Sequence, residues 1–127
     1  MTGYKPDTSA PPDDRLTRKI ILLRSLRGVF NINEVMEFKL AEERQKGDKP
    51  SAELDRLGEF FSTGNGKRWL DHAAIWVYRN HYSYREIKRM IRFYRTPAGQ
   101  KTADSLPVII VQLLAASESI MKAIPEK

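Results

Sequence analysis

The 127-residue sequence contains no cysteine. This absence excludes disulfide bonds, thiolate metal sites and cysteine nucleophiles, and it leaves the redox compartment open. Histidine is scarce as well. His72 and His81 do not share a helix face, and no His-Glu-x-x-His pattern accompanies them. We therefore expect no metal site and no cofactor.

Long apolar runs are also lacking. Met1 is followed by a polar segment with several prolines, so we see no signal peptide in the sequence. The most apolar stretch, Leu106 to Ala116, is interrupted by Pro107 and Gln112. This stretch is too short to cross a bilayer, so we expect no transmembrane segment.

Catalytic patterns are missing too. No serine lies in a nucleophile-elbow pattern, and no spacing brings two carboxylates together. The segment Ser62–Lys67 resembles part of a phosphate-binding loop, but its glycines lack the required gap, so we interpret it as a turn between helices. We predict that the protein is not an enzyme. An enzyme whose site is assembled from distant residues is the least favoured alternative.

Apolar side chains recur at helical spacing along most of the chain, and we find neither strand-like alternation nor an internal repeat. We predict an all-α fold, a compact bundle of about five to six helices. Residues 1–12 are interpreted as a flexible arm and residues 13–125 as a single helical domain. The sequence predicts capping residues at Asp13 or Asp14 for the first helix, at Asn31 or Asn33 for the second and at Ser51 for the third, and further helices that begin at Lys67, Tyr84 and Pro97. We expect the first helix to end at Gly28.

Aromatic residues are dense around the fourth predicted helix, over residues 67–81. We expect one side of this helix to be apolar, formed by Trp69, Leu70, Ala73, Trp76 and Val77. These aromatic residues can be core and interface anchors, which is the interpretation that we favour, or they can line a ligand groove. The residues concerned are Trp69, Trp76, Tyr78, Tyr82 and Tyr84.

The fifth predicted helix, over 84–95, has two contrasting faces. Ser83 and Glu86 form a capping-box pattern at its start. Its apolar stripe consists of Ile87, Met90, Ile91 and Tyr94. The opposite face is basic and is the candidate binding face, with Arg85, Lys88, Arg89, Arg92 and Arg95. Such a face could follow phosphates, although basic residues also commonly cover exposed helix faces.

The last predicted helix runs from Pro97 to about Ala123. Thr96 followed by Pro97 is a second helix start, because proline at the first position loses no hydrogen bond. Pro107 should kink or split the helix, since it removes one backbone hydrogen bond and clashes with the carbonyl of Ala103. The residues after Pro107 are apolar over a broad arc, so we expect this helix at the centre of the bundle or in a subunit interface.

A family resemblance lies in the region 83–124. Glu86 and Ile87, the run from Phe93 to Lys101, and Pro107 resemble the signature of a bacterial family known as domain of unknown function 2059. The resemblance covers about the last third of the chain. It implies an all-helical protein exported across the inner membrane, with no established activity and no catalytic residues. Location in the periplasm therefore rests on the resemblance, and a cytoplasmic location is the alternative.

The motif itself is interpreted as a structural corner. Its residues are Phe93, Tyr94, Thr96, Pro97 and Gly99. Proline fixes the entry into the last helix, and glycine lets a neighbouring chain segment approach closely. We expect this corner to direct the last helix into the core.

The formal net charge of +6 favours acidic partners. We interpret the protein as a non-enzymatic helical module of the cell envelope that binds a protein or an acidic envelope component. A homodimer through the last helix is one form that such binding can take. The alternative is a nucleic-acid-binding module that uses the basic helix, although Asn80 and His81 precede the turn and do not lie on the following helix.

Overall fold

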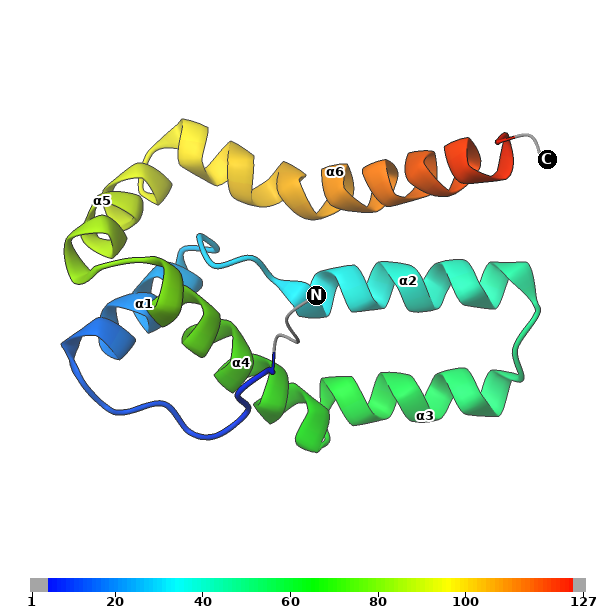
Figure 1. Cartoon of the computed structure of the whole chain (residues 1–127), viewed down its shortest axis with the longest axis horizontal. Helices are drawn as coiled ribbons and strands as arrows, with labels where there is room; N and C mark the ends of the chain where they lie inside the picture. Colours follow the sequence, from blue (N-terminus) through cyan, green and yellow to red (C-terminus); the bar gives the residue numbers. More distant parts are fainter. Residues whose placement is uncertain (1–4, 125–127) are drawn as a thin grey trace.

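Six α-helices form most of residues 5–124, the range described by the computed structural model (Figure 1). No strand occurs in this range, and the all-α prediction is confirmed. The helices are α1 (Arg15–Ser25), α2 (Ile32–Lys46), α3 (Ser51–Ser62), α4 (Asn65–His81), α5 (Tyr84–Tyr94) and α6 (Pro97–Lys122). The first four residues of the predicted arm and the end of the predicted domain at residue 125 lie outside the described residues.

Side-chain caps fix the starts of α1 and α2. At the start of α1, the side chain of Asp14 is the cap and accepts from the backbone N–H of Thr17. At the start of α2, the side chain of Asn31 is the cap and accepts from the backbone N–H groups of Asn33 and Glu34. The cap predicted for α3 is wrong. Ser51 is the first residue inside that helix, and no side chain caps it.

The predicted end of α1 also needs correction. The helix ends at Ser25, and Arg27, not Gly28, adopts the left-handed conformation with a φ of 63°. Gly28 is required for a different reason, because a Cβ there would lie only 2.6 Å from Cδ2 of Tyr94. The glycine thus allows α5 to approach the segment that follows α1.

The main core lies where α1, α4 and α5 meet. It consists of Ile20, Leu23, Val29, Ile75, Ile87 and Ile91. The α5 stripe is confirmed in its two buried isoleucines, with Met90 and Tyr94 partly buried beside them. The predicted apolar side of α4 is wrong in part: Ile75 is its buried residue, whereas Trp69 is 42% exposed and packs against Phe60.

A second unit of packing is the antiparallel pair α2 and α3, which lies beside this core (Figure 1). Leu54 of α3 and Val35 of α2 are buried there. Gly47 ends α2 in the left-handed conformation, with a φ of 70°, and allows the chain to reverse.

Helix α6 does not lie at the centre of the bundle, so the first of its two expected positions is wrong, while the second, a subunit interface, stays a prediction. It packs only on α5 and α2 among the described elements, and only Gly99, Ala103 and Pro107 are buried. The helix continues through Pro107 without splitting and changes direction gently along its course (Figure 1). The corner therefore directs α6 along one side of the molecule, where α2 covers one flank and leaves the rest exposed.

Length and composition alone would allow α6 to cross a membrane. An 18-residue window of this 26-residue helix has a mean hydropathy of 1.4, and 6% of that window is buried. The expectation of no transmembrane segment rests on the shorter run from Leu106 to Ala116, and it stays a prediction.

Residues 5–12 form no helix and reach α4. The indole N–H of Trp76 donates to the carbonyl of Ser9 at 3.0 Å, and Nδ1 of His72 lies 3.2 Å from the carbonyl of Thr8. This part of the predicted arm therefore contacts the helical domain.

Candidate functional site

The capping box at the start of α5 sets the orientation of the basic face. The backbone N–H of Glu86 donates to the Ser83 hydroxyl at 3.2 Å, and the N–H of Ser83 donates to the Glu86 carboxylate at 2.8 Å. The second bond lowers the pKa of Glu86. With the start fixed and Ile87 and Ile91 buried, the positions on the opposite side of α5 must face outward.

All five predicted basic residues are exposed to solvent: Arg85, Lys88, Arg89, Arg92 and Arg95. None of them forms an ion pair with any residue between 5 and 124. The ammonium of Lys88 lies 5.5 Å from the ring centre of Tyr84. The positive charge of α5 is thus not compensated within the described part of the chain.

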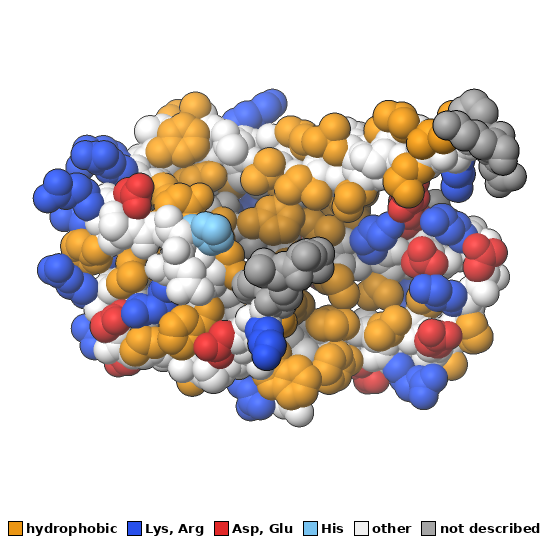
Figure 2. Space-filling view, in the orientation of Figure 1, with side chains coloured by type: hydrophobic (Ala, Val, Ile, Leu, Met, Phe, Trp, Pro, Cys, Tyr) orange, Lys and Arg blue, Asp and Glu red, His pale blue; other side chains and the backbone are white. Residues whose placement is uncertain are grey.

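The net positive charge of the protein is located on two helices and their flanks. Residues 13–27 contain five basic and two acidic residues, and residues 83–96 contain five basic and one acidic. These segments carry +7 together, whereas the whole chain carries +6. Figure 2 shows Lys and Arg side chains gathered at the end formed by α1 and α5, while acidic and basic side chains alternate at the opposite end.

A groove of about 250 Å³ separates α1 from α5 within this basic end. Lys19 lines one wall, and Lys88, Arg92 and Arg95 line the other. Leu22 and Ile91 complete the lining with apolar surface. Lys19 is absent from the predicted site, because nothing in the sequence indicates that α1 packs against α5.

Other arginines, in α1, in the turn after it and in α4, have a structural role. Arg24 pairs with Asp71 on α4, and Arg27 pairs with Asp104 on α6. Arg79, which is 16% exposed, donates to Asp14 at 2.7 Å and to the hydroxyl of Thr17 at 2.8 Å. The bond from Arg79 and the N–H of Thr17 lower the pKa of Asp14 to about 2.

The corner between α5 and α6 is closed by short-range bonds. The Thr96 hydroxyl accepts from the N–H of Gly99 at 3.0 Å and donates to the Phe93 carbonyl at 2.6 Å. Gln100, which we did not assign to the corner, donates to the carbonyls of Leu26 and Tyr94. The corner therefore also holds the end of α1.

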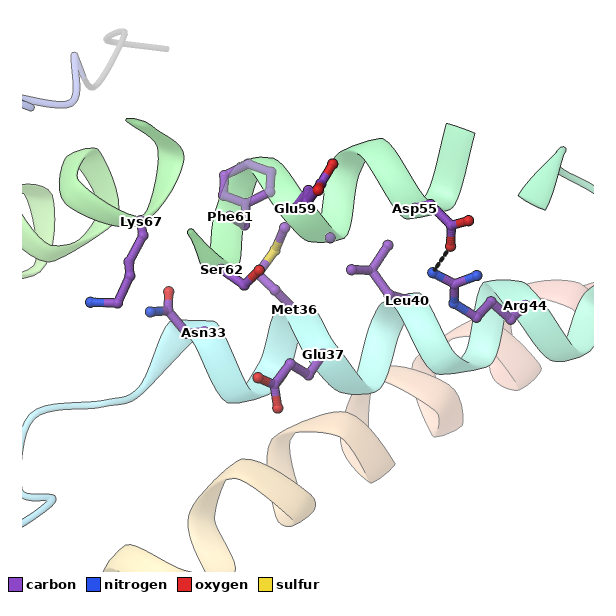
Figure 3. Close-up of a pocket in the computed structure, with 11 residues that line it drawn as sticks. Asn33, Met36, Glu37, Leu40, Arg44, Asp55, Glu59, Phe61, Ser62 and Lys67 are labelled. Carbon is purple, nitrogen blue, oxygen red and sulfur yellow. Dashed lines mark hydrogen bonds and ion pairs between the residues drawn. The ribbon is translucent and has the colours of Figure 1, made fainter. Parts of the chain in front are cut away.

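A cavity of about 630 Å³ lies between α2 and α3 (Figure 3). Arg44 and Asp55 pair across it at 2.7 Å near one end. Lys67 lies near the opposite end, and its ammonium pairs with Asp71 at 3.1 Å. The Ser62–Lys67 segment contains the connection between α3 and α4, as interpreted from the sequence, and its lysine serves this ion pair.

The two histidines have different surroundings. His72 contacts Thr8, and His81 lines an apolar groove of about 510 Å³ together with Phe30, Tyr78 and Tyr82. No group of three potential metal ligands occurs within residues 5–124. The expectations of no metal and no enzymatic activity stay predictions.

The described residues form an all-helical fold, and the corner lies within the segment that a family model matches. Residues 70–126 match the model of a family described as "Uncharacterized protein conserved in bacteria (DUF2059)", so this segment is similar to that family. The match confirms the resemblance. It begins within α4 and includes all of α5 and α6, whereas Lys19 lies outside it. Searches of curated proteins and of solved structures found no match.

Proposed function

We propose that the protein is a non-enzymatic module that binds an anionic, phosphate-bearing component of the bacterial cell envelope through its basic groove. This groove is the surface formed by Lys19, Lys88, Arg92 and Arg95 between α1 and α5. The observation that carries the proposal is the location of the whole net positive charge on these two segments, without ion pairs on α5. Location in the envelope rests on the family resemblance.

The geometry of the groove favours an anion over a merely solvated helix face. Cations line both walls, so their potentials add in the space between them. Lysine and arginine donors suit phosphate oxygens, and arginine can bind them with two parallel hydrogen bonds. A solvated face would not require a cation on the facing helix.

The apolar lining distinguishes between classes of anion. Leu22 and Ile91 lie among the cationic side chains, and none of the described residues that line the groove is aromatic, Asn, Gln or Ser. An amphiphilic anion such as an acidic phospholipid carries both a phosphate and apolar groups. Nucleic acid would find no aromatic side chain among these residues on which to stack its bases. We therefore favour an anionic lipid over the nucleic-acid alternative.

Co-sedimentation with lipid vesicles tests this function. We expect binding to vesicles that contain phosphatidylglycerol, none to pure phosphatidylcholine, and a steep loss with added salt. Each basic residue near an anionic surface contributes about 1 kcal/mol, so replacing Lys88 and Arg92 by Gln should lower the partition coefficient roughly 30-fold.

A matched control separates the groove from net charge. Arg56 and Arg68 are exposed and form no ion pair with the described residues, so their double replacement by Gln makes the same change in net charge. This control should retain most of the binding. Equal loss in both variants would contradict the site, and tighter binding to DNA than to phosphatidylglycerol at the same salt concentration would favour the nucleic-acid alternative.

A further inference from the structure

The C-terminal half of α6 presents an unusual apolar surface. Most of its large apolar side chains are at least 40% exposed, from Val108 at 40% to Met121 at 68%, whereas Ile110 and Val111 are partly buried. The exposed residues are Val108, Ile109, Leu113, Leu114, Ile120 and Met121, with Ile124 just beyond the helix. Figure 2 shows apolar side chains following α6 along the molecule. Monomeric proteins rarely leave a continuous surface of this kind uncovered.

Part of this surface has the spacing of a coiled-coil seam. Ile109, Leu113, Ala116, Ile120 and Ala123 follow one another at intervals of four, three, four and three residues. This is the repeat of the a and d positions that lets two helices pack side by side. All five residues are exposed. We call them the α6 seam.

The seam lies on the side of α6 that faces away from the rest of the molecule. Glu118 pairs with Lys39 of α2 at 3.6 Å, which identifies the flank that packs on α2. Successive residues turn by about 100° around a helix, so Glu118 lies nearly opposite the seam residues Ile120 and Ala116. No described element covers this opposite side.

We propose that a second copy of the chain covers the α6 seam, with the two helices antiparallel around a twofold axis between Leu114 and Ala115. In this register Ile109 of one copy faces Ile120 of the other, and Leu113 faces Ala116. Large side chains then meet small ones at the centre, as in well-packed cores. Each contact occurs twice, as a twofold interface requires.

The charge pattern favours a second copy over a charged partner. The positions that flank the seam are all uncharged, namely Ile110, Gln112, Ser117, Ser119 and Ile124. Flanking charges normally select an oppositely charged partner and repel an identical one, and neither effect arises here. The excess positive charge lies on α1 and α5, so it does not need to enter this interface.

Sedimentation equilibrium over a range of protein concentrations tests the proposal. The seam is only about 21 Å long, so we expect a reversible dimer whose dissociation can be followed. Leu113→Glu should raise the dissociation constant roughly 30-fold or more, as does the loss of one dominant interface residue. The control is Ile21→Glu on α1, which is 51% exposed and should leave the dimer intact.

Cysteine cross-linking tests the direction of the helices, because the chain has no other cysteine. A mixture of Ile109→Cys and Ile120→Cys proteins should form mixed disulfides on oxidation, whereas either protein alone should do so much less. Ala115→Cys, which lies off the seam, should not cross-link with either. These variants alter exposed side chains, so folding can be verified by circular dichroism.

Two results would overturn the proposal. One is a wild-type protein that stays monomeric at every concentration. The other is a monomer that binds pure phosphatidylcholine vesicles, because lipid would then cover the seam. The dimer does not depend on the basic groove, so the Lys88 and Arg92 variant should dimerise normally whatever its vesicle binding.

Discussion

Two glycines inside helices should respond in opposite ways to the same substitution. Gly58 lies in α3 and Gly99 in the first turn of α6. Alanine is about 1 kcal/mol more favourable than glycine in a helix interior, so Gly→Ala is stabilising where the added methyl group fits. The surroundings of each Cβ therefore decide the sign of the effect.

At Gly58 the methyl group fits. The nearest atom to its Cβ would be Cδ1 of Leu40 at 3.6 Å, which is an ordinary contact at the edge of the α2–α3 cavity. We expect Gly58→Ala to raise the free energy of unfolding by about 0.5–1 kcal/mol.

At Gly99 the methyl group meets backbone that cannot rotate away. Its Cβ would lie 2.6 Å from Cα of Tyr94 and 2.7 Å from the carbonyl carbon of Phe93. Overpacking costs about 1–3 kcal/mol. Opening the corner would also weaken the Thr96 cap, which contributes about 1 kcal/mol. These costs exceed the gain in helix propensity, so Gly99→Ala should lower the free energy of unfolding by about 1–3 kcal/mol.

Urea denaturation followed by circular dichroism measures both effects. The midpoints can be compared directly if the free energy of unfolding depends on urea concentration with the same slope in all three proteins. The midpoint should rise for Gly58→Ala and fall for Gly99→Ala. A Gly99→Ala protein as stable as the wild type would refute the close approach of α5 to α6 at this corner.

Three further predictions concern the core, a cap and acid stability. Ile87→Ala should lower the free energy of unfolding by about 2–5 kcal/mol, because Ile87 is 0% exposed. Ile21→Ala should change the free energy of unfolding far less, and similar losses in the two variants would contradict the core assignment. Thr96→Ala should cost about 1 kcal/mol and Thr96→Ser much less, and equal losses would show that the hydroxyl does not act as the cap. The pKa of Asp14 is lowered to about 2 from 3.8, so its contribution to stability is complete above about pH 4 and is lost as the pH falls towards 2. Urea midpoints measured across this pH range should fall less steeply for Asp14→Asn than for the wild type, and identical slopes would argue against this contribution.

Features that depend on neighbouring residues could be predicted from the sequence. The capping box of Ser83 and Glu86 and the start of α6 at Thr96 involve contacts within four residues, so their patterns are visible in the chain itself. The two faces of α5 follow from the helical period for the same reason.

Features that depend on distant segments could not be predicted. The apolar arc of α6 indicates that something should cover it, but not which element does so, and α2 covers only one flank. Lys19 joins the basic groove because α1 packs against α5, far away in the sequence. Trp69 and Ile75 are both apolar, and only the arrangement around α4 determines which of them is buried.

The position of the main core has a consequence for biosynthesis. Its residues come from α1 near the start of the chain and from α4 and α5, which ends at Tyr94. A ribosome delivers these segments in order, so α1 emerges long before the helices that enclose it, while α2 and α3 can pair early. The nascent protein therefore acquires its stable core late, in one step, when α5 becomes available.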